Sequence, residues 1–219
     1  MKYLLTSAGI TNDKIADALA ALAGKPLCEL SILFVPTAAN TEKDDKRWLI
    51  ENLTDIESQG FKLIDILDVA AVSDEIWKPR FFNADIICVG GGNEKYLASL
   101  FSKIGMKEFL TMLPDNKVYM GISAGSMVTG HFIPNELYGL VYPEENFSEP
   151  EKHEMMLQNL CFIPHLNSNF FQHVRKKSLD SLDEKFTKTV YAMDDETALA
   201  IDGNQPNFVG TGEYWSSIK

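Results

Sequence analysis

Residues 117–130 read KVYMGISAGSMVTG, a pattern that predicts a buried strand, a sharp turn and the start of a helix. The strand covers 117–120, and the turn at 121–125 has the form G-x-S-x-G. Such a turn holds its central residue in a strained backbone conformation, and its glycines keep side chains away where strand and helix pass close together. The hydroxyl of Ser123 is therefore expected at the carboxyl end of the strand.

This strand–turn–helix form is that of a nucleophile elbow, which predicts chemistry at Ser123. A serine hydroxyl is a weak nucleophile until a base removes its proton. A partner histidine, and a group that orients that histidine, are therefore expected elsewhere in the chain. The alternative is a turn of small residues without chemistry, because G-x-S-x-G also occurs often by chance.

The composition is that of an ordinary soluble chain, and it argues against two classes of partner. Of the 219 residues, 45% are hydrophobic and 23% are charged, with a net charge of -11 and a pI of about 4.8. An acidic surface disfavours nucleic acid and anionic membranes as main partners, since both select basic patches. The densest basic cluster is the short run at 175–177.

The N-terminus and the cysteines favour a cytoplasmic location. The first residues, MKYLLTSAGI, lack the apolar length of a signal peptide, and no apolar run approaches the roughly 18 residues of a membrane span. Cys28, Cys88 and Cys161 are widely spaced and lie in or beside apolar runs, so they are expected to be reduced thiols of the core. Their spacing does not suggest a metal site.

Strands and helices alternate through the first 120 residues. Strands are predicted at 1–7, 31–35, 61–67, 86–89 and 117–120, helices at 12–24, 41–59 and 94–113, and a short helix or turn at 73–82. The strands are apolar throughout, which is typical of a parallel sheet covered on both faces by helices. Because no repeat, low-complexity tract or linker interrupts the chain, residues 1–219 are predicted to form a single α/β domain.

The second half is less regular. Residues 131–148 contain prolines, asparagines and aromatics and are predicted to form loops or short strands. A strand at 160–163, a helix at 175–188, strands at 189–193 and 197–201 and a final strand near 208 follow. The segment 131–160 could be a lid, a specificity loop or the contact of a homodimer.

Three unusual segments follow predicted strands, at the edge where open parallel sheets bind ligands. They are Ser123, His165 and the run Gly90-Gly91-Gly92-Asn93. In the functional interpretation, Gly91 or Gly92 supplies one N–H group of an oxyanion hole, and Ala124 supplies the other. In the alternative, the glycines form only a tight turn or an anion cradle, although no complete phosphate-binding motif is present.

His165 is the best placed of the four histidines, because it directly follows a buried strand; His131, His153 and His173 lie in loop or helix contexts. The orienting acid has three candidates, Asp195, Glu196 and Glu136. Asp195 and Glu196 are neighbours at a strand end, so only one can face the imidazole; either could instead belong to a solvated acidic turn. No histidine follows Asp195, which disfavours an ordinary α/β-hydrolase.

With these motifs in order, the sequence resembles the peptidase E family of aspartyl dipeptidases and cyanophycinases. The resemblance covers most of the chain and is carried by Thr6-Ser7, FVPTA at 34–38, VGGGN at 89–93, GISAGS at 121–126, IPH at 163–165 and DDETAL at 194–199. It implies a class I glutamine-amidotransferase-like (flavodoxin-like) three-layer sandwich. It also implies that Ser123 is the nucleophile, that His165 is the base and that the Gly91, Gly92 and Ala124 amides hold the oxyanion.

The sequence departs from the family pattern at the acid and in the segment that follows the histidine. Family members commonly place a Glu two residues before the Thr-Ala pair, and that position is Asp195 here. Aspartyl dipeptidases also use an Arg downstream of the histidine to hold the acidic side chain of the substrate. Arg175 is the candidate for that role in this chain, although the intervening segment is shorter.

Together these patterns predict a cytoplasmic serine peptidase that acts on small peptides, with dipeptides bearing an N-terminal Asp among its candidate substrates. The predicted catalytic residues are Ser123, His165 and Asp195, and no metal or organic cofactor is required. Two alternatives stay open. One is a hydrolase of the same fold acting on another amide or ester, and the other is a catalytically inactive member that binds a peptide or metabolite.

Overall fold

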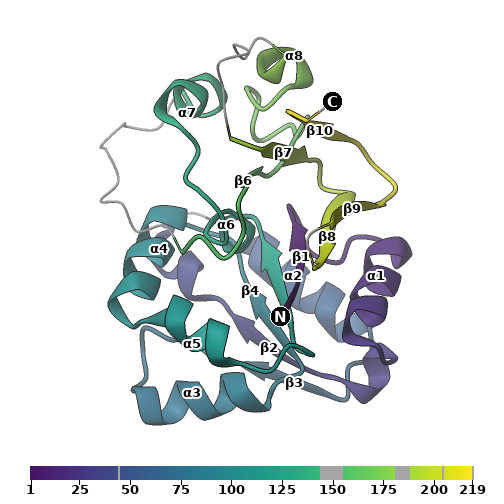
Figure 1. Cartoon of the computed structure of the whole chain (residues 1–219), viewed down its shortest axis with the longest axis vertical. Helices are drawn as coiled ribbons and strands as arrows, with labels where there is room; N and C mark the ends of the chain where they lie inside the picture. Colours follow the sequence, from purple (N-terminus) through teal and green to yellow (C-terminus); the bar gives the residue numbers. More distant parts are fainter. Residues whose placement is uncertain (44, 144–154, 181–187, 204, 219) are drawn as a thin grey trace.

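The computed structural model describes residues 1–219 except 44, 144–154, 181–187, 204 and 219. Its strands are β1 (Lys2–Thr6), β2 (Ser31–Val35), β3 (Leu63–Ile66), β4 (Ile86–Val89), β5 (Val118–Ile122), β6 (Cys161–Ile163), β7 (Val190–Met193), β8 (Thr197–Asp202), β9 (Gln205–Gly210) and β10 (Tyr214–Ser216). They form one sheet of order β3-β2-β4-β5-β1-β8-β9 and a second of order β10-β7-β6 (Figure 1).

The helices of the first 113 residues connect the strands of the large sheet and lie on its two faces. The α-helices are α1 (Asp13–Ala23), α2 (Arg47–Ser58), α3 (Asp74–Asn83), α4 (Glu94–Lys103), α5 (Met106–Met112), α6 (Ala124–Met127), α7 (Asn135–Val141) and α8 (Lys176–Leu179). Two short 3-10 helices, η1 (Leu27–Glu29) and η2 (Thr37–Thr41), precede β2 and α2. The helix α1 begins as predicted, because the side chain of Asn12 accepts a hydrogen bond from the Ile15 amide.

The five strands β3, β2, β4, β5 and β1 run parallel to one another. At the edge beyond β1, β8 pairs antiparallel with β1, and β9 pairs antiparallel with β8. Thr6 at the end of β1 pairs in register with Ile122 at the end of β5. Ser123, which follows Ile122, therefore emerges beside the loop that leaves β1. This mostly parallel sheet confirms the fold class predicted from the apolar strands.

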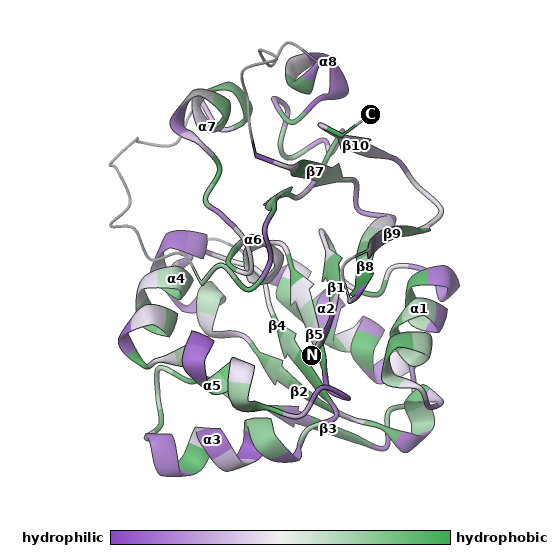
Figure 2. Ribbon diagram, in the orientation of Figure 1, coloured by the Kyte–Doolittle hydropathy of each residue, from purple (hydrophilic) through white to green (hydrophobic). Residues whose placement is uncertain are grey.

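Alternate side chains of the strands enter two separate cores, one on each face of the sheet. On β5, Met120 belongs to the core that includes Ile15 of α1, and Tyr119 to the core that includes Trp77 of α3 and Phe101 of α4. Hydrophobic colouring is concentrated along β2, β4 and β5 between the helical layers (Figure 2). Burial on both faces explains why these strands are apolar at every position.

The second sheet corrects two predictions. The strand before His165 is β6, which pairs with β7 in the small sheet and not with the large parallel sheet. The segment 131–148 was expected to form loops or short strands, but it contains the helix α7. The apolar side chains Leu137 of α7 and Cys161 of β6 lie in one shared core. Residues 144–148, and 181–187 of the helix predicted at 175–188, lie outside the described residues.

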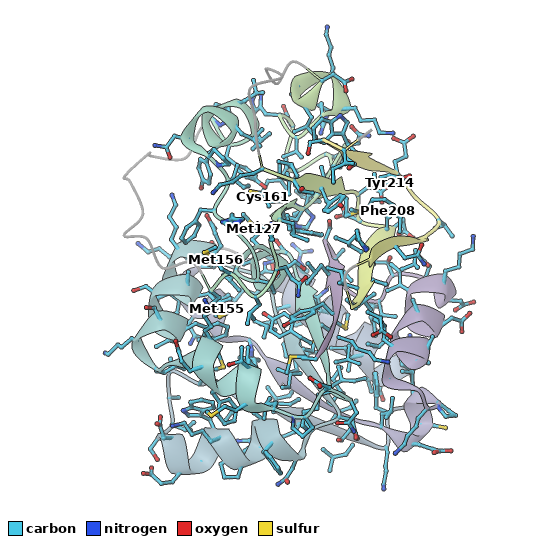
Figure 3. All side chains as sticks on the ribbon, in the orientation of Figure 1. Met127, Met155, Met156, Cys161, Phe208 and Tyr214 are labelled. Carbon is cyan, nitrogen blue, oxygen red and sulfur yellow. The ribbon has the colours of Figure 1, made fainter. Side chains whose placement is uncertain are left out.

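Aromatic and apolar contacts help to join the small sheet to the large one. Phe208 of β9 and Tyr214 of β10 stack with ring centroids 3.7 Å apart, and both are marked in Figure 3. Met127, the last residue of α6, packs against the core of the large sheet and also against the core of the small sheet. The helix α6, which follows Ser123, therefore contacts the cores of both sheets.

All three cysteines are free. Cys88 and Cys161 are buried as expected, but the prediction of a core position is wrong for Cys28, which is exposed in η1. Within the part of the chain that the structure describes, no helix combines the length and apolar character needed to cross a bilayer. The same residues contain no cluster of three or more histidine, cysteine or acidic side chains suited to hold a metal ion.

Substitution of Gly125 tests how tightly the elbow packs on the sheet. A Cβ atom added there would overlap the carbonyl oxygen of Val89, which is backbone and cannot rotate away. We expect Gly125→Ala to lower the free energy of unfolding by at least about 3 kcal/mol, measured by urea denaturation. Gly139→Ala in α7 is the matched control. An added Cβ meets nothing within 4 Å at Gly139, so that change should stabilise by about 0.5–1 kcal/mol.

Candidate active site

Ser123 lies in the strained turn that the sequence predicts. Its backbone angles are φ 49° and ψ -111°, a conformation that a residue with a side chain rarely adopts. The turn is fixed to β1 by Ser126, whose hydroxyl donates to the carbonyl of Thr6 at 2.8 Å and accepts from the Thr6 amide at 3.0 Å. The elbow is thus held from both sides, by β5 before it and by β1 beside it.

A continuous line of hydrogen bonds joins three of the predicted residues. The Ser123 Oγ atom lies 3.0 Å from Nε2 of His165, and the Nδ1 atom of that ring lies 2.6 Å from Oδ1 of Asp195. An ionised carboxylate can only accept, so Nδ1 carries the proton and Nε2 is left to accept from the serine. This is the tautomer that a general base needs to activate a serine.

Of the two other acids considered from the sequence, Glu196 bonds elsewhere, and the side chain of Glu136 is outside the described structure. The Oε2 atom of Glu196 accepts from the side-chain amide of Asn12 at 3.0 Å. Asp195 and Glu196 are neighbours in the turn between β7 and β8, where Asp195 bonds to the imidazole and Glu196 bonds to Asn12. The backbone of Glu136 lies in α7, and its side chain lies outside what the structure describes.

The imidazole is largely buried, whereas the acid is half exposed. The side chain of His165 is 17% exposed and that of Asp195 is 40% exposed. Partial shielding strengthens the hydrogen bond between them relative to one in bulk water. The other described histidines differ: His131 bonds through Nε2 to the side chain of Asn159 at 2.9 Å, and His173 is exposed. His153 lies outside the described residues.

The loop between β1 and α1 carries three side chains that bond to the backbone near His165 and Asp195. The hydroxyl of Ser7 accepts from the His165 amide at 3.0 Å and donates to the carbonyl of Met193 at 2.9 Å. Thr11 donates to the carbonyl of Asp195 at 2.8 Å, and Asn12 donates to that of Glu196 at 3.0 Å. The large sheet thereby positions two loops that originate in the small sheet.

The glycine run lies directly beside the nucleophile. A Cβ atom built on Gly91 would be 3.3 Å from the Cβ of Ser123 and 3.6 Å from the indole of Trp48. Gly92 has φ 131° and packs on the backbone of Ala38, where a side chain would collide with the carbonyl group. Glycine is therefore required at Gly92, and at Gly91 a side chain would crowd Ser123.

Arg175 lies in the same region, but its guanidinium group bonds to its own loop. Nη1 donates to the carbonyls of Phe171 at 2.9 Å and Val174 at 3.0 Å, and Nη2 donates to that of Ser168 at 2.9 Å. Phe171 in turn stacks on the ring of His165. The predicted substrate-binding arginine thus closes the loop that begins at the histidine.

A protein-family model covers nearly the whole chain. The model of peptidase family S51 matches residues 3–209. The chain belongs to peptidase family S51. Family membership places it among the peptidase hydrolases and confirms the resemblance drawn from the sequence motifs. No curated protein sequence matches the chain.

Solved structures confirm the fold of this S51 peptidase. A candidate peptidase E protein from Listeria monocytogenes EGD-e superposes with a TM-score of 0.72 at 20% identity, over 96% of this chain and 98% of that chain. A peptidase from an acI-B1 actinobacterium superposes with a TM-score of 0.70 at 20% identity, over 97% of this chain and 88% of that chain. These likenesses establish the three-layer α/β architecture.

Sequence reasoning did not single out Ser7 or Phe171 for the site of this S51 peptidase. Ser7 ends a strand in a run of small residues, and Phe171 is one of two adjacent phenylalanines in a loop. Neither belongs to a pattern that predicts contact with a histidine far away in the chain. The Thr6-Ser7 pair in the family resemblance was the only available signal for Ser7.

We expect Ser7→Ala to weaken both activity and stability of the S51 peptidase. The change would leave the His165 amide and the Met193 carbonyl without their partner, at about 1–3 kcal/mol for each buried group. We expect kcat to fall roughly tenfold and the free energy of unfolding to fall by about 2 kcal/mol. Ser58→Ala removes the hydroxyl that donates to Asp55 on the exposed end of α2 and is the control. Equal effects of both variants would contradict the positioning role of Ser7.

Proposed function

We propose that this S51 peptidase is a serine peptidase that hydrolyses small peptides. The observation that carries the proposal is the hydrogen-bonded line from Ser123 through His165 to Asp195. The serine lies on a strained turn, the histidine is in reach of its hydroxyl, and the acid faces the far side of the ring. These are the three relationships on which a serine nucleophile depends.

In the proposed reaction, the Oγ atom of Ser123 attacks the carbonyl carbon of the scissile peptide bond, and its proton passes to Nε2 of His165. The tetrahedral intermediate collapses when the C–N bond breaks and the imidazolium gives that proton to the departing amine. Water then attacks the acyl-enzyme with the same base, which releases the acid and regenerates Ser123. Asp195 holds the Nδ1–H group and stabilises the imidazolium formed in each step.

The negative oxygen of the intermediate would be bound by backbone amides of Ala124 and of Gly91 or Gly92. Ala124 directly follows the nucleophile as the first residue of α6, and Gly91 lies against Ser123. Donors of this kind are aimed where charge develops, and each contributes about 2.7–4 kcal/mol to the barrier reduction. The proposed chemistry uses only groups of the chain and water.

For the substrate, dipeptides with an N-terminal Asp are the first candidates. Their recognition would need a cation, and Arg175 follows the proposed base by ten positions in the sequence. Three of its five guanidinium N–H groups bond to loop carbonyls. A substrate carboxylate would bind to the remaining N–H groups, or replace loop carbonyls as partners.

The test is hydrolysis of a dipeptide panel that pairs Asp-Leu with Asn-Leu, Leu-Leu and Lys-Leu. Cleavage confined to Asp-Leu and weakened by Arg175→Ala would support an aspartyl dipeptidase. Cleavage of uncharged dipeptides with no preference for Asp would keep the serine peptidase and remove the role of Arg175 in specificity. A folded protein that cleaves no peptide would favour one of two alternatives, a hydrolase of other amides or esters or an inactive binding protein. An ester panel separates those two.

A further inference from the structure

We propose that the loop 165–175 is a positioning device for the catalytic base, and that Phe171 is the group through which it acts. The inference rests on the proposed function, because it assigns Phe171 a part in keeping His165 productive. Phe171 acts through the imidazole that it contacts, so it is a positioning residue. Its neighbour Phe170, which is 93% exposed, provides a control in the same loop.

The ring of Phe171 lies flat on the ring of His165. Their centroids are 4.7 Å apart and the planes differ by 10°. Phe171 also contacts Tyr142, with centroids 6.1 Å apart and planes at 85°. Tyr142 is buried at the C-terminal end of α7, so the aromatic contact is backed by the core of the small sheet. The phenyl ring thus contacts both the base and a buried aromatic side chain.

The loop that presents Phe171 is closed by bonds within itself. The amide of Asn167 donates to the carbonyl of Val174 at 2.8 Å, and the amide of Val174 donates to that of Phe171 at 3.1 Å. The guanidinium group of Arg175 adds three bonds to carbonyls of the same loop, described above. At its start, the Leu166 amide donates to the carbonyl of Met193 at 2.8 Å. Both ends of the loop are therefore tied down, and Phe171 has a defined position.

Stacking opposes a motion of the imidazole that would break the line of hydrogen bonds. Rotation about the Cβ–Cγ bond of His165 would carry Nε2 away from Ser123 and Nδ1 away from Asp195. A flat ring packed on the imidazole face opposes that rotation. When the imidazole gains a proton in the transition state, its positive charge also lies on the π face of Phe171, which attracts cations. Both effects act on the chemical step, so kcat should respond more than KM.

The kinetic experiment compares Phe171→Ala, Phe171→Leu, Phe171→Tyr and the control Phe170→Ala on the best substrate of the panel. We expect Phe171→Ala and Phe171→Leu to lower kcat roughly tenfold with KM changed less than about twofold. Phe171→Tyr should keep kcat within about twofold, because a tyrosine ring stacks as well. Phe170→Ala should also match the wild type in kcat. Thermal unfolding of each variant shows whether the fold is retained.

A second readout follows the base directly and needs no substrate. In proton NMR of the 15N-histidine-labelled protein, the Nδ1–H resonance of His165 is assigned by its loss in His165→Gln, and its exchange with water is measured. We expect faster exchange in Phe171→Ala and Phe171→Leu than in wild type, Phe171→Tyr or Phe170→Ala. Unchanged exchange and unchanged kcat in folded Phe171→Ala would overturn the positioning role and leave the proposed function standing. If wild type cleaves no peptide, the proposed function fails and the exchange rates alone decide the positioning role.

Discussion

Replacing Ser123 by alanine is expected to lower kcat/KM for the cleaved dipeptide by about 10⁴- to 10⁶-fold. The change removes the only atom of the site that forms a covalent bond with the substrate in the proposed reaction. What remains is binding and the oxyanion amides of Gly91 and Ala124, which still favour attack by water to a small extent. Chromatographic measurement of the cleavage products over hours covers this range of rates.

The fold of Ser123→Ala should be unchanged, because alanine removes a single oxygen and keeps the Cβ atom at the elbow. Its thermal unfolding midpoint should therefore stay close to that of wild type. The strained backbone at this position, φ 49°, is carried by the surrounding strands and not by the hydroxyl. Activity within tenfold of wild type in the folded variant would mean that another residue is the nucleophile.

Asp195→Asn is expected to have the next largest effect, about 10⁴-fold on kcat. The asparagine side chain fits the same space, but its amide can donate to Nδ1 of His165 and stabilise the wrong tautomer. Nε2 would then carry the proton and could not accept one from Ser123. Asp195→Glu, which restores the residue common in the family, should retain far more activity than Asp195→Asn.

Glu196→Gln is the matched control for Asp195→Asn. The carboxylate of Glu196 bonds to Asn12, so its amide isostere should change kcat less than about threefold. A reversal of this order, with Glu196→Gln the more damaging change, would assign the orienting role to Glu196. Similar modest losses in both variants would point to Glu136.

The large sheet could be predicted from the sequence because each of its parallel strands is marked by a local residue pattern. Each of β2, β4 and β5 is a short apolar run bounded by turn residues, and such runs occur mainly in sheets covered on both faces. The small sheet could not be predicted in the same way. Its strands β6 and β7 are separated by a long segment of chain, and no residue pattern states which sheet a three-residue strand will join.

The same distinction holds for the site. Ser123 could be predicted because the elbow is a local motif, and His165 because it follows a strand and a proline. Choosing Asp195 over Glu196 required the conformation of a turn, which the two side chains alone do not determine. Ser7 and Phe171 depend on tertiary contacts: the bond from His165 to Ser7 spans 158 positions. Positioning contacts of this kind leave no local pattern in a single sequence.

The most direct test of the central claim is labelling with a fluorophosphonate, a reagent that reacts with activated serines. Intact-mass spectrometry and peptide mapping of the wild-type protein should find one adduct, on Ser123, and no adduct in Ser123→Ala or His165→Gln. Labelling does not depend on knowing the substrate, because it reports the nucleophile and its base. Folded wild-type protein that stays unlabelled, or that is labelled equally well in Ser123→Ala, would contradict the account.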